Sequence, residues 1–342
     1  MIRTVLGDIK KEELGVTSAH EHVMSDLRPL VDPIDHEDFY KPLTVDKRYL
    51  VNEDPYNVLD NAYLDTASTL EDLKIFKKWG GNAIVEVTTD DFGRDAKELK
   101  RLSIESGVKI VMATGRYVGG SISKEDAAKS VDVLAKEIID DIRIGAQGTD
   151  IKAGVIGEVG TSMEISDLEW KNVRAAGIAG AETGLGVHFH TALWGRNASA
   201  IIKEMTSLGV KPEKICIDHI DVDLRMDYLF EILDQGAYVE FDNIGKEFYV
   251  PKENQGLLHG RFAYDLERAV VVAELVKKGY ADKILLSNDI CLKSMLIPYG
   301  GNGYVHLLRH FKPMLKDQGI SDKDIEKMLV DNPANFLDVE KF

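Results

Sequence analysis

Two histidines one residue apart, His20 and His22, end the first strongly apolar stretch of the sequence. Alternate side chains of a strand point to the same face, so these two imidazoles are expected about 6.6 Å apart on one side of a strand. Neutral imidazole nitrogens are common ligands of divalent transition metals. The pair therefore indicates part of a metal site.

Residues of the same chemistry recur at or near the ends of later apolar runs. With the first pair they give six or seven potential metal ligands, which are His20, His22, Glu158, His190 with or without its neighbour His188, His219 and Asp289. Imidazole and carboxylate together suit Zn²⁺, and also Mn²⁺, Co²⁺ or Fe²⁺. Six ligands exceed the need of one tetrahedral ion, but they suffice for two ions about 3.5–4 Å apart if a carboxylate bridges them.

Short β-branched runs that could position these ligands alternate with helical patterns along the whole chain. The expected strands are 16–24, 83–89, 108–115, 153–161, 186–191, 215–221, 238–245 and 284–290, and the clearest helices are 124–144, 167–182, 197–208 and 262–278. Eight such units predict an α/β fold of the (β/α)8 TIM-barrel type, in which the carboxyl ends of all strands open onto one face. A doubly wound open sheet is the alternative, but it gives no reason for ligands on so many strand ends.

Composition narrows the class of protein. The 342 residues are 44% hydrophobic, enough for one large domain over 1–342. The net charge of −16 disfavours nucleic acid or an anionic membrane as partner. Two cysteines suggest reduced thiols, and the beginning of the sequence lacks a signal-peptide core, so we expect a cytoplasmic location.

A long insertion follows the first expected strand. It covers about 25–66 and is rich in Asp, Pro, Tyr and Asn. After a barrel strand it would lie over the carboxyl-terminal face, either as part of the site or as a surface excursion.

The ligand motifs resemble the phosphotriesterase family of the amidohydrolase superfamily. The motifs are HEH at 20–22, AGVIGEVGTS around Glu158, HFHT around His190, IDHID around His219 and LSND ending at Asp289, together with YGGNGY at 299–304 and MLVDNPANF at 328–336. The resemblance covers essentially the whole chain. It implies a binuclear (β/α)8 hydrolase that acts on a small molecule, and it suggests a homodimer.

The same resemblance distributes the ligands between the two ions. It implies that His20, His22 and Asp289 hold the more buried ion and that His190 and His219 hold the more exposed one. Many phosphotriesterases and lactonases of the family bridge their ions with a carboxylated lysine, whereas this chain has Gly157 and then Glu158. This matches the phosphotriesterase-homology branch, whose bridge is a glutamate, and it argues against organophosphates as native substrates. His188 is expected to pack beside the site.

The expected chemistry is hydrolysis. Two cations would depress the pKa of a bridging water and supply hydroxide, and Asp289 would accept and relay a proton. An ester or lactone, with or without an anionic or phosphorylated group, is the first expectation. An amidase for N-acyl amino or sulfonic acids and a phosphoester hydrolase are alternatives, and a metal-binding barrel without catalysis is the non-enzymatic one.

Three residues near strand ends are expected at the mouth of the barrel. Arg116 and Tyr117 follow the third strand, and Lys293 follows Asp289 by four positions. Cations there could bind an anionic part of the substrate, although Arg and Lys are also the commonest surface residues.

Overall fold

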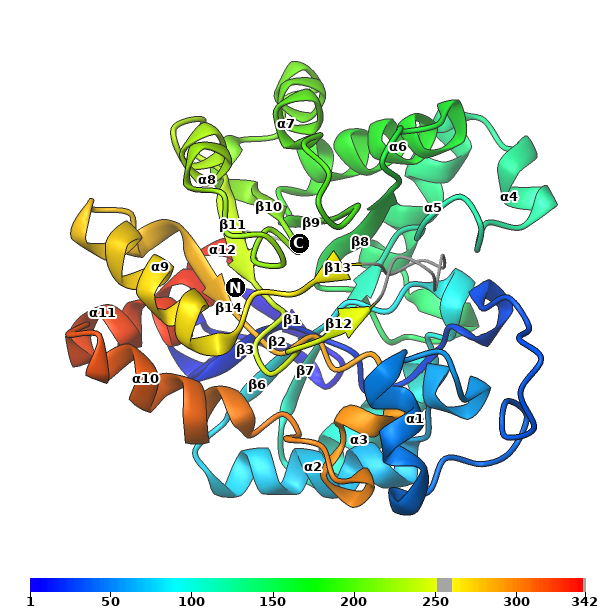
Figure 1. Cartoon of the computed structure of the whole chain (residues 1–342). Coiled ribbons are helices and arrows are strands. Elements are labelled where there is room, and N and C mark those ends of the chain that lie inside the picture. The colour runs from blue at the N-terminus through cyan, green and yellow to red at the C-terminus, as the bar shows by residue number, and fades with distance from the viewer. Residues whose placement is uncertain (251–259, 341–342) are drawn as a thin grey trace.

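The computed structural model describes residues 1–250 and 260–340. Its centre is a parallel sheet of eight strands in the order β14-β11-β10-β9-β8-β7-β6-β3 (Figure 1). In chain order these are β3 (Thr17–Glu21), β6 (Ala83–Glu86), β7 (Lys109–Thr114), β8 (Val155–Thr161), β9 (Val187–Thr191), β10 (Ile215–Ile217), β11 (Tyr238–Phe241) and β14 (Ile284–Leu286). All eight expected strands are confirmed, and most end a few residues earlier than predicted.

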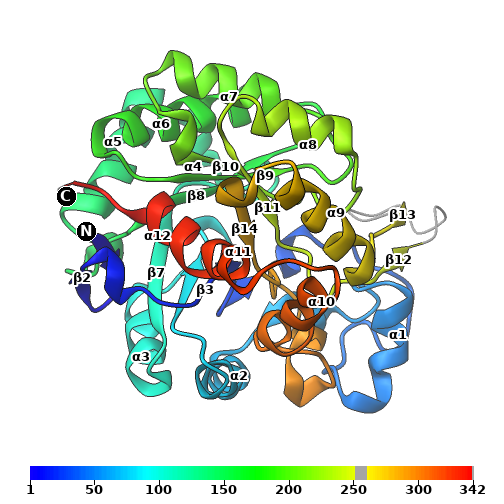
Figure 2. The ribbon, with the colours of Figure 1, turned by 90° about the vertical axis from the view of Figure 1, so that its left-hand side faces the viewer.

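Helices connect consecutive strands and surround the sheet, as the two views at right angles show (Figures 1 and 2). They are α2 (Thr66–Lys78), α3 (Ala96–Ser106), α4 (Lys124–Ala128), α5 (Val131–Arg143), α6 (Asp167–Thr183), α7 (Ala198–Ser207), α8 (Met226–Leu233) and α9 (Asp265–Lys277), followed by α10 (Lys312–Asp317), α11 (Asp322–Glu326) and α12 (Asn332–Leu337). The predicted (β/α)8 barrel is therefore confirmed, and the doubly wound alternative is wrong.

One predicted helix is two helices. The range 124–144 breaks at Lys129, whose backbone is extended, and a new helix begins after Ser130. The Ser130 hydroxyl accepts a hydrogen bond from the amide of Val133, which is the ordinary N-terminal cap of a helix.

The first and last strands meet through a side chain. The carboxylate of Glu21 in β3 accepts hydrogen bonds from the backbone amides of Asn288 at 3.0 Å and Ile290 at 2.8 Å, just beyond β14. The amide of Asp289, between them, donates to the carbonyl of His20 at 3.3 Å. Glu21 thus replaces part of a backbone ladder and fixes the segment that carries Asp289.

Apolar side chains fill much of the barrel interior, and α12 packs against them at the amino-terminal end of the strands. Phe336 of α12 is 1% exposed and lies against the rings of His188 and Tyr238. The six expected ligands lie at the opposite end of the strands.

The insertion at 25–66 is ordered and packs beside the loop after β14. It contains β4 (Ser25–Asp26), α1 (Arg48–Glu53) and β5 (Tyr63–Leu64), and β4 and β5 pair. Arg48 donates to the carbonyls of Ser294 and Tyr299, each at 3.0 Å. Outside the barrel and insertion, β1 (Ile2–Thr4) pairs with β2 (Gly7–Ile9), and β12 (Tyr249–Val250) pairs with β13 (Gly260–Arg261).

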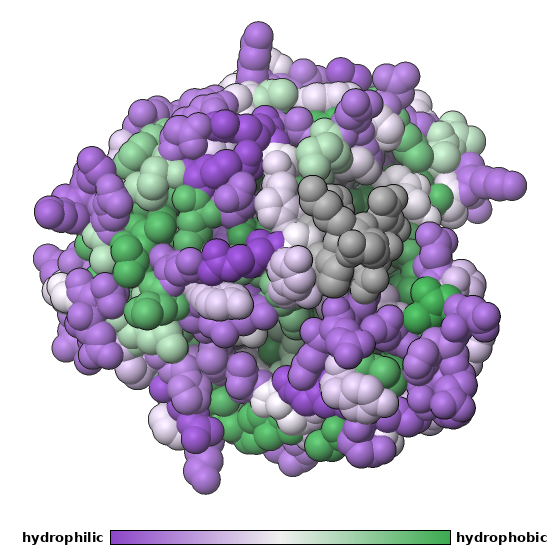
Figure 3. All heavy atoms as spheres, in the orientation of Figure 1, coloured by the Kyte–Doolittle hydropathy of each residue, from purple (hydrophilic) through white to green (hydrophobic). Residues whose placement is uncertain are grey.

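Hydrophilic residues cover most of the face shown in Figure 3, in keeping with the acidic composition. Apolar residues also gather on it over α9, where Leu266 and Val270 are 58% and 47% exposed. Within 1–250 and 260–340, every helix is too short or too polar to cross a membrane.

Candidate metal centre

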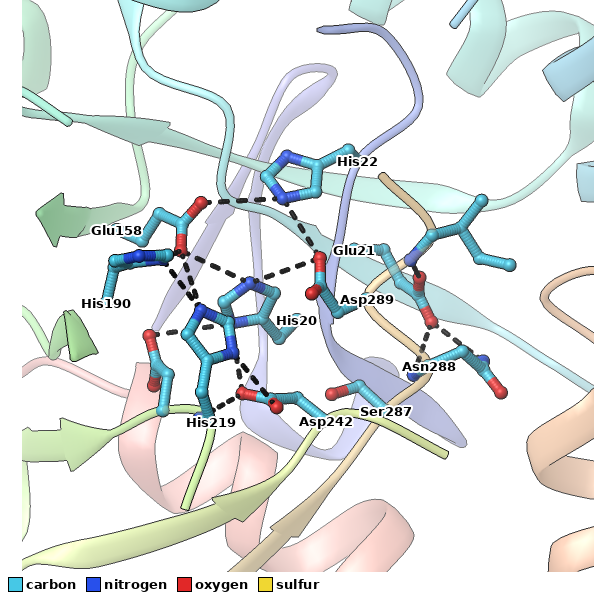
Figure 4. A network of polar contacts seen from close by, with 12 residues as sticks. His20, Glu21, His22, Glu158, His190, His219, Asp242, Ser287, Asn288 and Asp289 are labelled. Atoms are coloured by element: carbon cyan, nitrogen blue, oxygen red, sulfur yellow. Dashed lines mark hydrogen bonds and ion pairs between the residues drawn. The ribbon is translucent and has the colours of Figure 1, made fainter. Parts of the chain in front are cut away.

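All six expected ligands converge at the carboxyl-terminal ends of the strands (Figure 4). His20 lies in β3 and His22 directly after it, Glu158 lies in β8 and His190 in β9, and His219 and Asp289 follow β10 and β14. Five of the six are at most 6% exposed, and the side chain of His190 is 18% exposed.

One donor set consists of His20, His22 and Asp289. The Asp289 Oδ1 lies 3.2 Å from His22 Nε2 and 3.8 Å from His20 Nε2. His20 Nε2 and Asp289 Oδ1 are both buried and have no hydrogen-bond partner among the described residues. Buried polar atoms rarely remain unpaired, and donor atoms about 3–4 Å apart can share one cation. These atoms fit a bound metal ion.

A second donor set consists of His190 and His219. Their facing atoms, His190 Nδ1 and His219 Nε2, lie 2.8 Å apart, and both lie near Glu158 Oε2, at 3.0 and 3.4 Å. The other oxygen, Oε1, lies 3.5 Å from His22 Nε2 in the first set. Glu158 therefore faces both donor sets, as expected of a bridging carboxylate.

The electrostatics of the centre favour ionised carboxylates. Burial works against charge on Glu158, but His190, His219 and His20 hold its pKa well below the ordinary value. Burial, together with the neighbouring charge of His219, lowers the pKa of His190 in spite of Glu158, so its imidazole tends to be neutral, as a metal ligand must be.

The imidazoles are oriented by groups behind them. His219 Nδ1 lies 3.1 Å from Asp242, which also accepts the backbone amide of His219 at 2.8 Å. His20 Nδ1 lies 3.5 Å from Asp218 and 3.6 Å from Glu240. His188, predicted to pack beside the site, is fully buried and contacts these same two carboxylates. Carboxylates behind ligating histidines set ring orientation and tautomer.

His22 is oriented by a hydroxyl. Its Nδ1 lies 2.8 Å from Thr88 Oγ1, and that hydroxyl donates its hydrogen to the carbonyl of Met24 at 2.9 Å. A hydroxyl has one hydrogen, so Thr88 must accept the contact from His22. The hydrogen of His22 therefore resides on Nδ1, which leaves the Nε2 lone pair facing Asp289 and Glu158.

Two of the expected ligands have left-handed backbones. The φ angles of His219 and Asp289 are 62° and 46°, uncommon values for residues other than glycine. Asp242 holds the amide of His219, while Glu21 holds the amides on both sides of Asp289. Such strained positions persist where surrounding contacts fix them, and they concentrate at functional sites.

The centre opens into a cavity of about 650 Å³. Its walls are mainly apolar and come from the insertion and from loops after several strands; they include Leu27, Leu30, Tyr56, Phe92, Val118, Leu193, Trp194, Phe248 and Phe262. Among the described residues, Lys246 is the only lysine or arginine that lines it. Lys246 is buried and donates to Asp289 Oδ2.

The three expected substrate contacts are placed differently from one another. Tyr117 lines the cavity, with its ring centre 4.7 Å from that of His190. Arg116 lies outside the lining and pairs with Asp126 and Glu137 of α4 and α5 at 3.2 and 2.9 Å.

Lys293 is also outside the cavity lining. It pairs with Asp60 of the insertion at 2.7 Å and lies over the rings of Tyr63 and Tyr299. The structure thus brings neither Arg116 nor Lys293 to the cavity, because acidic residues on neighbouring elements hold both.

Sequence reasoning missed Glu21, Thr88, Asp242 and Lys246. Three of them carried a usable signal, because Thr88, Asp242 and Lys246 follow β6 and β11 at the end of the barrel where the ligands gather. The role of Glu21 depends on closure of the barrel, which spacing along the sequence does not reveal.

Comparisons with known proteins agree with this geometry. Residues 1–337 match the model of the phosphotriesterase family, whose members generally use two metal ions. N-acetyltaurine hydrolase from Bos taurus is 36% identical, with 98% of this chain and 97% of that protein covered.

Two solved structures are similar to the whole chain. A resiniferatoxin-binding protein from Rhodobacter sphaeroides has a TM-score of 0.94 at 33% identity, covering 98% of this chain and 94% of that one. The lactonase Lmo2620 from Listeria monocytogenes has a TM-score of 0.78 at 26% identity, covering 99% of both chains. The chain therefore belongs to the phosphotriesterase family, as its motifs predicted, and is a hydrolase.

Proposed function

We propose that this protein is a binuclear metal-dependent amidase that cleaves a small N-acylated amine carrying an anionic group, such as an N-acyl aminosulfonic acid. The observation that carries the proposal is the position of Glu158, whose two oxygens face the two donor sets. Our sequence prediction placed esters and lactones first. The name and 36% identity of the Bos taurus relative favour the amide, and the similarity to a lactonase keeps the lactone as the second candidate.

In this proposal the residues divide between two ions as the resemblance implies. His20, His22 and Asp289 would hold one ion, His190 and His219 the other, and Glu158 would contact both; Zn²⁺ is the ion we expect. Bound ions of this kind supply Lewis acidity and lower the pKa of a coordinated water.

The protein's own groups handle the protons. Amide hydrolysis joins a water oxygen to the acyl carbon, breaks the C–N bond and gives a proton to the leaving nitrogen. Asp289 is the base that takes the water proton and passes it on. Although burial favours the protonated acid, the Lys246 ammonium lowers the pKa of Asp289, so the carboxyl does not retain the proton.

Charge in the cavity favours a monoanionic substrate. Lys246 donates one N–H to Asp289, which leaves two for a sulfonate or carboxylate. Arg116 and Lys293 are engaged elsewhere, so the second and third cations that would favour a phosphorylated lactone are not at the cavity. Tyr117 remains a proposed substrate contact.

The test is a substrate panel on protein loaded with Zn²⁺, Mn²⁺ or Co²⁺. We expect two ions per chain and hydrolysis of N-acyl aminosulfonates or N-acyl amino acids in preference to lactones and phosphotriesters. Glu158→Gln should lose metal and activity together. Glu164→Gln, an exposed glutamate after the same strand, is the matched control and should retain both. Two bound ions without hydrolysis of any panel member would refute the proposal.

Three further expectations belong with this function. We predict that the chain forms one catalytic domain, that it acts in the cytoplasm, and that it is a homodimer. Light scattering on the purified protein measures the last directly, and a monomeric mass at micromolar concentration would contradict it.

A further inference from the structure

The side chain of Asn243, directly after Asp242 at the end of β11, has a fixed orientation. Its Nδ2 donates to Asp221 Oδ1 at 2.7 Å and to Asp242 Oδ1 at 2.6 Å, and its backbone amide donates to Asp221 Oδ2 at 3.1 Å. Asp221 is in turn paired with the fully buried Arg268, Nε to Oδ2, at 2.8 Å. Carboxylate oxygens accept hydrogen bonds, so the NH₂ group of Asn243 must face them.

The other side of this amide is a carbonyl oxygen, Oδ1. It receives no hydrogen bond from any residue of 1–250 or 260–340, and it keeps some accessible surface. Asn243 lines the same cavity as Asp289 and Lys246. Asn243 therefore offers the cavity an acceptor oxygen, and the hydrogen bonds to Asp221 and Asp242, which do not line the cavity, fix its direction.

We propose that Asn243 Oδ1 accepts the N–H of the scissile amide and thereby selects secondary amides over esters and lactones. This inference rests on the proposed amidase function and names the residue that sets its substrate class. Lys246 donates hydrogen bonds and so suits an anionic oxygen, whereas Asn243 Oδ1 suits only a donor. When the C–N bond breaks and the nitrogen gains its proton, the leaving amine still presents N–H groups to the same acceptor.

An ester or lactone places an oxygen where the amide has N–H. That oxygen cannot donate, so two acceptors would face each other after water has left. Sites built to hydrogen-bond a substrate group discriminate strongly against analogues that lack it. We expect this one contact to change the preference for amide over ester by about 10-fold or more.

The test compares two substrates that differ in one atom, 2-(acetylamino)ethanesulfonate and 2-(acetyloxy)ethanesulfonate, on the metal-loaded protein. In Asn243→Leu the ratio of kcat/KM for amide over ester should fall about 10-fold or more relative to wild type, with metal content unchanged. An equal loss on both substrates would show that Asn243 only supports the centre, and would overturn the inference.

A second measurement does not depend on the folding of Asn243→Leu. The N-methylated amide lacks the N–H, so wild type should cleave it at least about 10-fold more slowly than the parent amide. That penalty should shrink in Asn243→Ser, where the acceptor is withdrawn and space is gained. Equal cleavage of both amides by wild type would overturn the inference while leaving the amidase proposal intact. Failure to cleave either the amide or the ester with two ions bound would remove the proposed function and the inference with it.

Discussion

Lys246 Nζ donates to one oxygen of Asp289, while the other oxygen of the same carboxylate lies 3.2 Å from His22 Nε2. Both side chains are buried, and a buried charge pair is stable only when its groups are held in good geometry. The pair divides the two oxygens of Asp289 between a fixed cation and the metal centre. This division makes the basicity of Asp289 depend on a residue in the loop after another strand, β11.

The first prediction concerns that dependence. In Lys246→Met the pKa of Asp289 should rise, because the cation that lowers it is gone. The acidic limb of the kcat/KM profile should then move to higher pH, and kcat/KM for anionic substrates should fall about 10- to 100-fold. A pH–rate profile from pH 4 to 9 on the metal-loaded protein measures both effects.

Lys203→Met, an exposed lysine of α7, is the control for loss of a lysine as such and should leave the profile in place. If Lys246→Met keeps the wild-type limb at full metal content, Lys246 does not act through Asp289.

The second prediction concerns the hydrogen bonds by which Glu21 of β3 holds the segment after β14. Glu21 accepts the amides of Asn288 and Ile290, and a glutamine has only one acceptor oxygen for them. Glu21→Gln should therefore loosen the segment that carries Asp289, and we expect kcat to fall about 10- to 100-fold, as for other groups that orient metal ligands. Metal titration with a competing chelator should show weaker binding of one ion of the two. Equal weakening of both ions would instead indicate general loss of structure.

The third prediction tests the hydroxyl behind His22. Thr88→Val keeps the shape of the side chain but removes the acceptor for the hydrogen on His22 Nδ1. Loss of such a partner is expected to weaken metal binding about 10- to 100-fold. Thr88→Ser retains the hydroxyl and should bind metal nearly as wild type does. If the valine and serine variants bind metal equally well, the hydroxyl has no part in orienting His22.

The sequence predicts the barrel and the meeting of the six expected ligands because both follow from local patterns, and the family resemblance adds the choice of His190 over His188. Each strand is a β-branched run, and each ligand stands near the end where parallel strands converge. Contacts among distant residues have no such signal. Glu21 meets Asn288 across 267 positions, and nothing in the spacing of either residue indicates that the barrel closes through a side chain.

Arg116 and Lys293 illustrate a second limit of prediction from the sequence. Their position after strands suggested the cavity, yet the direction of a long cationic side chain depends on which acid lies nearest in space. Glu137 of α5 and Asp60 of the insertion lie within 3 Å of these cations, and neither is close to its partner in sequence. The same uncertainty does not affect the histidines, whose short side chains follow the strand direction.

The fourth prediction assigns Lys293 to anchoring the insertion. Lys293→Met should lower the free energy of unfolding by about 1–3 kcal/mol, because it leaves Asp60 without its cationic partner in a partly buried site. The insertion supplies cavity walls, so KM should rise more than kcat falls. Asp60→Asn should cost less when Lys293 is already methionine, which a double-mutant cycle by chemical denaturation measures. Additive losses would mean that the pair does not couple the insertion to the barrel.

The last prediction concerns stability and pH away from the centre. Asp72 of α2 is 1% exposed; its Oδ2 accepts the amide of Ile297, and its Oδ1 is buried without a partner among the described residues. Burial raises the pKa of Asp72 from 3.8 to about 7. Between these values the folded protein keeps a proton that the unfolded chain releases, so this residue lowers stability progressively as pH rises from about 4 to 7.

Asp72→Asn should remove that dependence, because the amide keeps an acceptor for Ile297 and never ionises. Its free energy of unfolding should be close to that of wild type at pH 4, exceed it increasingly up to pH 7, and level off above, with a gain of up to roughly 4 kcal/mol. Glu71→Gln, at the exposed neighbouring position, should show no such trend. Denaturant unfolding of the three proteins across this range decides the matter, since a difference between Asp72→Asn and wild type that does not change with pH would mean that Asp72 is ionised throughout.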